Sequence, residues 1–549
     1  MSVSSASSNQ SSNSPNARTV DAVIVGAGFA GLYMLHRLRE QGLTAQIFEA
    51  GSGAGGTWFW NRYPGARVDV ESMQYSYQFS EELQQEWQWS ERYAPQAELL
   101  EYLNHVVERF GLAPDIQFNT RVESAVFDDS SKTWQVSTDQ GDQVNAKYCI
   151  MATGCLSKAN KPDIAGMDSF NGPTYHTGEW PHEEVDFSGM RVGIIGTGSS
   201  AIQAIPEIAR QAEHLTVFQR TPNFSVPARN KPLDPEEVKN VKQNYGALRE
   251  AGQQQFGAFD ADSNTKAAAE MSPEEIKAEL NKRWQMGGLN FFGVFVDFLV
   301  TQEANDIVAD FVREKIAERV NDPETAALLA PNTVFGCKRI CADTDYFETY
   351  NRNNVTLVDI SKTSISVITP EGLKVGDGSS EDKAYAFDAL VFATGFDAMT
   401  GSLNKIDIRG CGGQTLKEKW AAGPLTYLGL CSAGFPNLFT ISGPGSPSVF
   451  TNMVTSIEQH VEYIGDIIAY MTDNKLATIE ASQEAETQWV AHVNEVASYT
   501  LLNSCNSWYL GANIPGKKRV FMPYAGGFPP YVAKCNEVAA KGYEGFTLS

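Results

Sequence analysis

Two glycine-rich turns, at residues 26–31 (GAGFAG) and 196–201 (GTGSSA), constrain the fold of this chain more than any other feature. An apolar run of strand length precedes each turn, at 20–25 and 191–195, and apolar residues at helical spacing follow it. The glycines of such a turn permit a tight bend and let the backbone approach a pyrophosphate, which the N–H groups of the next helix hold. The sequence therefore predicts an α/β fold with two Rossmann-like dinucleotide-binding domains.

The two units differ at the end of their second strand. Glu49 and Gln219 each lie 23 residues after the first glycine of their turn. The Glu49 carboxylate can accept hydrogen bonds from a ribose diol, as FAD or NAD requires. Gln219 removes that negative charge, and the guanidinium of Arg220 after it suits a 2′-phosphate. We therefore expect the first turn to bind FAD and the second to bind NADPH.

The second unit is interrupted by a helical stretch. Asp234 and Ser272 each precede a proline and two glutamates, which is the pattern of a helix N-terminus. Runs at 355–358 and 389–392 are typical of strands that complete the second unit, and a long helix is expected near 456–471. We expect a disordered tail at 1–18, an FAD-binding domain at 19–158 and 390–549, an NADP-binding domain at 159–231 and 335–389, and a helical insertion at 232–334.

The charge of the chain limits its partners. Its 43 Lys and Arg against 66 Asp and Glu give a net charge of −23, which argues against nucleic acid. The longest apolar run, 290–300, is interrupted by Asp297 and is too short to span a bilayer, so we expect a buried helix there. Residues 1–18 are rich in Ser and Asn and lack the apolar core of a signal peptide. We expect a cytoplasmic protein with no membrane partner, and favour a monomer.

The eight cysteines form no C-x-x-C pair, and no histidines cluster near them. Neither a zinc site nor a framework of disulfides is indicated, and we expect no bound metal. For a cytoplasmic protein, the expectation is that all eight thiols are reduced.

Longer blocks of the sequence carry a family resemblance. Residues 55–72 (GGTWFWNRYPGARVDVES) and the pattern F-x-G-x3-H-x3-W-P at 170–181 resemble the type I Baeyer–Villiger monooxygenases. Further matching blocks lie at 335–339, 346–355, 443–448 and 506–513. The resemblance covers nearly the whole chain and is closest to the phenylacetone and steroid monooxygenase branch. One departure is Val68, where we expect Cys in many relatives; beside Asp69 it should alter packing more than chemistry.

The resemblance implies a reaction. In this family NADPH reduces FAD, O2 adds at the flavin C4a atom, and the peroxyflavin attacks a ketone to give an ester or lactone. The branch implies aryl, acyclic or bulky ketones. By motif match, Arg339 is the permanent cation that stabilises negative charge in this step, and Asp69 is the carboxylate that holds Arg339 in place.

The resemblance also implies cofactor contacts. For FAD these are Gly26, Gly28, Gly31, Glu49, Thr57, Trp58, Asp69, Tyr75, Met453 and the backbone of Val122. For NADPH these are Gly196, Thr197, Gly198, Ser199, Ser200, Arg220, Thr221, Lys338 and Trp508, the last on a mobile loop that closes the site. His176 and Trp180 lie between the two units, so we expect a conformational role for them instead of acid–base chemistry.

Other functions share parts of this pattern. A flavin-containing monooxygenase that oxygenates nitrogen or sulfur has both turns, but its linker normally ends in Tyr-Lys, where this chain has Trp180 and Pro181. A disulfide reductase is disfavoured, because the helix after Gly31 carries no cysteine pair. A non-catalytic NADPH sensor on the same fold would consume no NADPH. The nitrogen- or sulfur-oxygenating enzyme is the main alternative.

Overall fold

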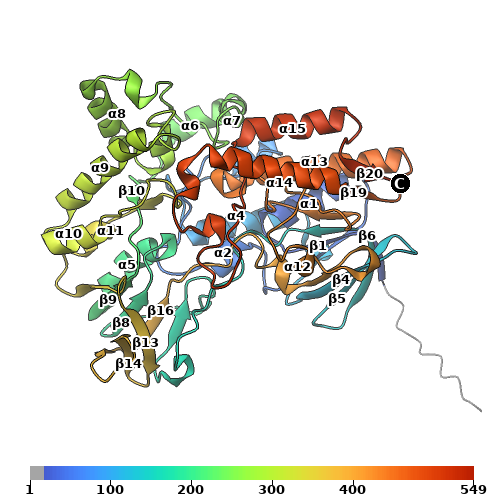
Figure 1. Ribbon diagram of the computed structural model, residues 1–549. Coiled ribbons are helices and arrows are strands. Elements are labelled where there is room, and N and C mark those ends of the chain that lie inside the picture. The colour runs from blue at the N-terminus through green and yellow to red at the C-terminus, as the bar shows by residue number, and fades with distance from the viewer. Residues whose placement is uncertain (1–17) are drawn as a thin grey trace, which may run out of the picture.

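The computed structural model describes residues 18–549, which form two α/β units, a helical insertion and a helical C-terminal part (Figure 1). The tail expected at 1–18 lies outside the described residues except for Arg18, which already belongs to the first strand. Within 18–549, no helix is long and apolar enough to cross a membrane.

The first unit is built on an eight-stranded sheet. Its central strand β1 (Arg18–Val25) runs parallel to β2 (Ala45–Phe48) and β6 (Gln143–Met151), and helix α1 (Phe29–Glu40) connects β1 to β2. The remaining strands are β3 (Ile116–Gln117), β4 (Val122–Asp128), β5 (Thr133–Thr138), β17 (Asp407–Arg409) and β18 (Leu438–Thr440). All four residues of β2 are buried, including the polar Gln46, as in a strand covered on both faces. The first glycine turn therefore joins a strand to a helix, as predicted.

The second unit is built on a parallel five-stranded sheet. Its strands, in spatial order, are β12 (Val355–Asp359), β9 (His214–Gln219), β8 (Arg191–Ile195), β16 (Ala389–Phe392) and β7 (Thr174–His176), and α5 (Ser199–Gln211) follows the second glycine turn. The two sheets confirm the predicted α/β fold with two Rossmann-like units. A domain boundary between 389 and 390 would cut β16, because the chain leaves this sheet only after Phe392. A small antiparallel sheet of β13 (Ser364–Thr369), β14 (Gly372–Gly376) and β15 (Lys383–Ala386) precedes β16.

The helical insertion lies between two short strands, β10 (Ser225–Pro227) and β11 (Cys341–Asp343), which pair in parallel at its base. Its helices are α6 (Pro235–Gln243), α7 (Tyr245–Gln253), α8 (Pro273–Met286), α9 (Gln302–Arg319) and α10 (Pro323–Leu329). The Asp234 and Ser272 side chains cap α6 and α8, as the sequence predicted.

The expectation of a buried helix over 290–300 is wrong. A short 3-10 helix (Gly288–Gly293) is followed by turns. The reason is that its backbone bonds to a neighbouring segment instead of to its own next turn: Gly293 O accepts from Asn264 N at 2.8 Å, and Val296 N donates to Lys266 O at 3.2 Å.

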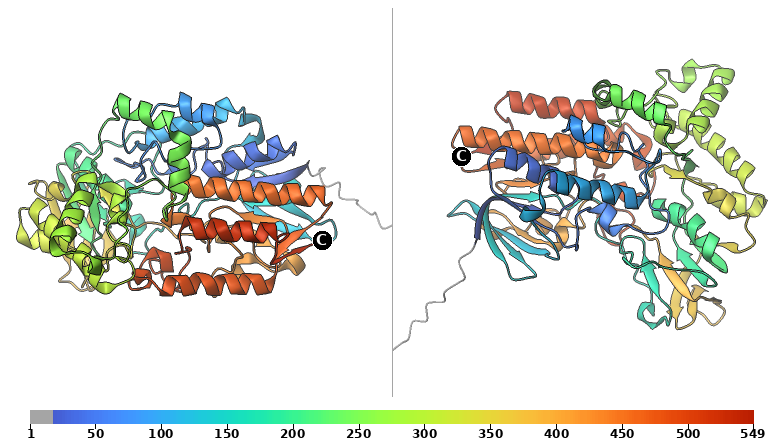
Figure 2. Two further views of the ribbon diagram at one scale, coloured as in Figure 1. Left: turned by 90° about the horizontal axis from the view of Figure 1, so that it is seen from above. Right: turned by 180° about the vertical axis from the view of Figure 1, so that it is seen from behind.

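The C-terminal part returns to the first unit. Helix α13 (Met453–Asp473), which covers the long helix expected near 456–471, packs against α1 and contacts α15 (Phe528–Ala540). Helix α14 (Gln483–Ser498) lies on the other side of α15 in the view from above (Figure 2). The last strands, β19 (Ile479–Ala481) and β20 (Phe546–Leu548), pair with each other. Short helices complete the chain at α2 (Thr57–Trp60), α3 (Glu81–Glu86), α11 (Tyr346–Thr349) and α12 (Leu416–Lys419), and α4 (Gln96–Arg109) is a longer helix near α1.

Candidate active site

A cavity of about 780 Å³ brings together the first glycine turn, the 55–72 block and residues from the end of the insertion and the C-terminal part. Of the predicted site residues, it is lined by Gly26, Gly28, Glu49, Thr57, Trp58, Asp69, Tyr75, Val122, Ser199, Arg339, Met453 and Trp508. Gly31, Gly196, Thr197, Gly198, Ser200, Arg220, Thr221 and Lys338 do not line it. The structure thus gathers nearly all of the residues expected at FAD, and leaves most of those expected at NADPH around the second turn.

The first glycine turn has the shape that a dinucleotide needs. Gly26 has a φ of +105°, and a Cβ there would lie 2.7 Å from the carbonyl oxygen of Ala152. At Gly31 a Cβ would collide with the carbonyl oxygen of Gly26, so this glycine serves the packing of α1 on β1. Gly28 caps α1 and supplies no side-chain hydrogen bond, which leaves the first N–H groups of the helix for an anion.

Glu49 is held beside this turn. Its Oε2 accepts a hydrogen bond from Ala27 N and its Oε1 accepts one from Gly51 N, both at 2.7 Å. The side chain is buried but lines the cavity. A carboxylate has about four acceptor positions, so Glu49 keeps capacity for a ribose diol while its orientation is fixed by the backbone. The turn and Glu49 therefore fit FAD.

Arg339 and Asp69 meet at the wall of the cavity. Arg339 Nε donates to Asp69 Oδ2 at 2.7 Å, and Arg339 Nη2 donates to Asp69 Oδ1 at 2.9 Å. Arg339 Nη1 donates to the carbonyl oxygen of Val449 at 2.5 Å. A guanidinium has five N–H groups, so two remain free of these bonds. Both side chains keep about a quarter of their surface exposed, 22% for Arg339 and 27% for Asp69.

The guanidinium of Arg339 stays protonated. Burial lowers the pKa of the guanidinium, but the Asp69 carboxylate raises it by more, so the pKa lies above its ordinary value. Arg339 therefore remains a cation at every pH at which the protein is folded.

Asp69 is positioned by the block that carries the family resemblance. The side chain of Gln203, on α5, accepts a hydrogen bond from Tyr63 Oη at 2.8 Å and donates one to the carbonyl oxygen of Arg67 at 3.1 Å. At Gly65 a Cβ would collide with the carbonyl oxygen of Gln203, so only glycine permits this close approach. The block is therefore fastened to the second unit just before Asp69, while Asp69 itself pairs with Arg339.

The second glycine turn repeats the first with one difference. Gly196 has a φ of +113°, and a Cβ there would collide with the carbonyl oxygen of Ala393. Gly198 caps α5 and has no heavy atom within 4 Å of the position that a Cβ would take. The Thr197 hydroxyl donates to the carbonyl oxygen of Thr221 at 3.0 Å, which joins this turn to the end of β9. The open space over Gly198 and the free N–H groups of α5 fit a pyrophosphate.

Arg220 and Lys338 are two cations without a protein partner. Within residues 18–549, neither side chain makes a hydrogen bond or an ion pair. Burial and the positive charge of Arg220 both lower the pKa of Lys338. Gln219 is turned away, since its Nε2 donates to the carbonyl oxygen of Leu328 at 2.7 Å. A pair of unpaired cations in a chain of net charge −23 is suited to a phosphate.

Two serines expected at NADPH also contact protein groups. Ser199 Oγ lies 3.0 Å from Cys341 Sγ, and Ser200 Oγ lies 3.1 Å from Thr177 Oγ1. Burial raises the pKa of the Cys341 thiol to about 12, so it stays protonated near neutral pH.

His176 lies where the two linkers between the units meet. Its Nδ1 accepts a hydrogen bond from Gly178 N at 3.0 Å, so Nε2 carries the proton and donates to Thr394 Oγ1 at 3.2 Å. Burial lowers the pKa of His176, which favours the neutral ring. Trp180 is buried and stacks on Tyr175 with ring centroids 5.2 Å apart. Both ring nitrogens of His176 are engaged, which agrees with a conformational role.

The expectation that all eight thiols are reduced is wrong for two of them. Cys337 and Cys505 form a disulfide, with Cα atoms 6.1 Å apart. They are separated by 168 residues, so only the fold brings them together. The other six cysteines are free. Within 18–549, no group of three or more His, Cys, Asp and Glu residues could hold a metal ion.

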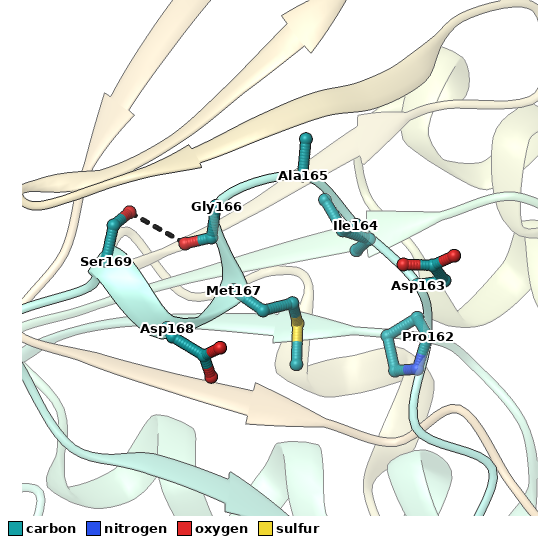
Figure 3. A pocket seen from close by; sticks show the side chains of 8 residues that line it. All are labelled: Pro162, Asp163, Ile164, Ala165, Gly166, Met167, Asp168 and Ser169. Carbon is teal, nitrogen blue, oxygen red and sulfur yellow. Dashed lines mark hydrogen bonds between the residues drawn. The ribbon is translucent and has the colours of Figure 1, made fainter.

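A second hollow, of about 700 Å³, lies on the linker before β7 (Figure 3). One continuous segment, 162–169, lines it, and its labelled side chains are mostly small or apolar. Ser169 Oγ closes the turn with a hydrogen bond of 2.7 Å to the carbonyl oxygen of Gly166. With no cation and no side chain from another element, this hollow has none of the features of the main cavity.

Two contacts of the site have no signature in the sequence. The carbonyl oxygen of Val449 holds Arg339, but any residue supplies a carbonyl. Gln203 holds the 55–72 block, but its role depends on the placement of α5 against that block. Val449 could be suspected only because it directly follows the matching block 443–448, and Gln203 only because it follows the second glycine turn.

Known proteins resemble this chain over nearly its whole length. The family model for pyridine nucleotide-disulphide oxidoreductases matches residues 23–277. A phenazine N-monooxygenase from Lysobacter antibioticus is 43% identical over 96% of this chain and 97% of its own length. A Baeyer–Villiger monooxygenase from Pseudooceanicola batsensis is 42% identical over 96% of this chain and 97% of its own length. The structure of an oxidised steroid monooxygenase bound to NADP has 51% identity and a TM-score of 0.92, and covers 96% of this chain and 99% of that one.

Proposed function

Because the chain belongs to the Baeyer–Villiger monooxygenase family, we propose that it uses NADPH and O2 to convert ketones into esters or lactones, with aryl, acyclic or bulky ketones as its preferred substrates. It is an NADPH-dependent flavoprotein monooxygenase whose cofactors are FAD and NADP(H). The observation that carries the proposal is the Arg339 cation, fixed by Asp69 and Val449 at the wall of the cavity with two N–H groups to spare.

FAD fits the first glycine turn and the cavity next to it. Gly26 and Gly28 let the backbone approach the pyrophosphate, and Glu49 accepts hydrogen bonds from the ribose. Thr57, Trp58 and the other predicted FAD residues that line the cavity complete its walls. When bound, FAD supplies hydride transfer and the activation of O2.

NADPH fits the second glycine turn. Gly198 leaves room for the pyrophosphate, and the N–H groups of α5 hold it. Arg220 and Lys338 bind the 2′-phosphate, which gives each of them a partner. Trp508, which lines the cavity, covers the nicotinamide end and helps to exclude water.

Arg339 is the catalytic residue of this site. Negative charge develops on oxygen as O2 is reduced and as the ketone carbonyl is attacked, and a fixed guanidinium stabilises this charge without first having to be reoriented. Asp69 is a positioning residue for Arg339, because its two oxygens fix the guanidinium plane.

The preference for aryl, acyclic or bulky ketones is supported by the steroid monooxygenase at 51% identity. We also propose a division into an FAD-binding part, 19–158 with the C-terminal residues, and an NADP-binding part, 159–231 with 335–392, separated by the insertion. A cytoplasmic location would give the enzyme access to NADPH.

Oxygenation of nitrogen is the second candidate function. It is favoured by the phenazine N-monooxygenase, which is 43% identical to this chain. Its substrate would be an aromatic heterocycle with a nucleophilic nitrogen, and the same cofactors would serve it.

A substrate panel separates these functions. The FAD-loaded protein is given NADPH and O2 with phenylacetone, cyclohexanone, a steroid ketone or phenazine, and NADPH oxidation and product mass are followed. We expect ketone-dependent NADPH oxidation and a product that is one oxygen heavier and is an ester or lactone. A protein that oxygenates phenazine but no ketone would instead support the second candidate.

A further inference from the structure

The Cys337–Cys505 disulfide connects two segments that both carry predicted site residues. Cys337 directly precedes Lys338 and Arg339. Cys505 lies three residues before Trp508 in residues 501–519, called here the Trp508 segment. One covalent bond thus joins the segment that carries the catalytic cation to the segment whose Trp508 lines the cofactor cavity.

The Cys337 end of the bond is rigid. Phe335, two residues earlier, donates its N–H to Asn305 Oδ1 at 2.8 Å and accepts from Asn305 Nδ2 at 2.9 Å. Asn305 belongs to α9 and is wholly buried, as is Cys337. This side of the disulfide is therefore anchored to the helical insertion.

The Cys505 end is weakly held by other means. In the described chain, apart from the backbone bonds of its short 3-10 turns, every hydrogen bond made by residues 503–508 has its partner inside the Trp508 segment. The segment is built of short 3-10 turns, Leu501–Asn503 and Trp508–Leu510. Cys505 itself is half-buried. Without the disulfide, residues 503–508 are fixed by apolar packing and by their flanks, where Asn513 and Lys517 bond to Phe396 and Asp397. Local opening of this stretch therefore breaks no hydrogen bond to the rest of the protein.

We infer that Cys337 and Cys505 form a reversible oxidation site, at which hydrogen peroxide converts two thiols into a disulfide that tethers the Trp508 segment over the cofactor cavity. Its effect on NADP+ release rests on the proposed function. In a reducing cytoplasm such a bond is typically transient and responds to oxidants. Peroxide is a suitable oxidant because flavin monooxygenases release it when O2 is consumed without a substrate.

The chemistry balances with one peroxide for one disulfide. The Cys505 thiolate attacks a peroxide oxygen, the O–O bond breaks, and a sulfenic acid forms with loss of one water. The Cys337 thiol then attacks that sulfur and displaces a second water, so both electrons reach the peroxide. Cys505 is the first to react since it is half-buried and Cys337 is fully buried. An external dithiol reverses the reaction by thiol–disulfide exchange.

The first test counts thiols and does not depend on enzyme activity. The FAD-loaded protein is reduced with a dithiol, desalted, treated with hydrogen peroxide or left untreated, and its thiols are titrated after unfolding. Eight thiols are expected in the reduced form and six after peroxide, with a crosslinked peptide that joins Cys337 to Cys505. Loss of thiols without that peptide would overturn the inference.

The second test measures release of NADP+ from both forms. Tethering raises the local concentration of the Trp508 segment at the cavity, so reduction should speed NADP+ dissociation about fivefold or more. Cys505→Ser should match the reduced form whether or not peroxide is added. Cys411→Ser, at another half-buried cysteine that is free, should keep the full response.

The outcomes separate the two proposals. Equal dissociation rates for oxidised and reduced wild-type protein would overturn the tether, even if ketones are converted to esters. A redox response in NADP+ release without any ketone oxygenation would leave the tether standing and contradict the proposed function. The comparison of oxidised with reduced wild-type protein needs no variant, so it still tests the tether if Cys505→Ser folds poorly.

Discussion

Arg339 and Asp69 lie 270 positions apart in the chain, yet their side chains form two parallel hydrogen bonds of 2.7 and 2.9 Å. Arg339 follows the helical insertion, and Asp69 belongs to the 55–72 block, which Gln203 fastens to the second unit. The cation is therefore placed by contacts from both units of the protein, which gives a physical reason for the long block around Asp69.

Removing the charge of Asp69 should leave Arg339 cationic but poorly oriented. Charged hydrogen bonds contribute about 1.5–3 kcal/mol, so Asp69→Asn should lower the rate of ester formation by about tenfold to a hundredfold. The flavin absorbance of the purified protein shows whether FAD remains. Glu71→Gln is the matched control, because Glu71 pairs with a different cation, Arg92. Wild-type ester formation by Asp69→Asn would contradict the positioning role.

The two glycines of the second turn should respond differently to alanine. Gly198 has a φ of −84°, which any residue can adopt, and the space at its Cβ position is open, so Gly198→Ala should melt like wild type but raise the KM for NADPH. At Gly196 the φ of +113° and the carbonyl of Ala393 oppose a side chain, so Gly196→Ala should lower the melting temperature. An unchanged KM for NADPH in Gly198→Ala would show that the pyrophosphate does not bind at this turn.

Arg220 should distinguish NADPH from NADH. A lost hydrogen bond to a charged phosphate costs about 1.5–3 kcal/mol, so Arg220→Ala should raise the KM for NADPH about tenfold or more and leave that for NADH nearly unchanged. Lys277→Ala, at an exposed lysine of the insertion, serves as the control. Equal effects on both cofactors would show that Arg220 does not bind the 2′-phosphate.

Glu458 should make stability depend on pH. Burial raises the pKa of this α13 carboxyl to about 7, although it accepts hydrogen bonds from Gln78 N and Phe79 N. The folded protein therefore binds more protons than the unfolded chain between about pH 4.5 and 7, and its stability falls as pH rises through that window. In Glu458→Gln the free energy of unfolding should fall less as the pH rises, with a difference from wild type of about 1–3 kcal/mol at pH 8. Melting temperatures of both proteins from pH 5 to 8 provide the test, and parallel curves would contradict it.

Local features were predictable from the sequence, whereas contacts between distant segments were not. Strand, glycine turn and helix follow each other within residues 18–40 and again within 191–211, so the spacing of apolar residues and glycines predicts both units. The apolar run at 290–300 was predicted wrongly, because its backbone bonds to residues 264–266, which no local pattern indicates. The Cys337–Cys505 bond was missed for the same reason. The carbonyl of Val449 was missed because a backbone group leaves no trace in the sequence.

The most direct test of the account is the ester yield per NADPH consumed by Arg339→Ala. Without the cation, the negative charge that develops on oxygen loses its stabilisation, while Glu49, Arg220 and the two glycine turns still hold the cofactors. We predict that the variant retains its flavin absorbance and consumes NADPH more slowly, that it forms no ester, and that the oxygen it consumes appears as hydrogen peroxide. Arg339→Lys, which keeps a charge but cannot form the two parallel bonds to Asp69, should recover little of the yield. A near wild-type ester yield per NADPH from Arg339→Ala would contradict the central claim.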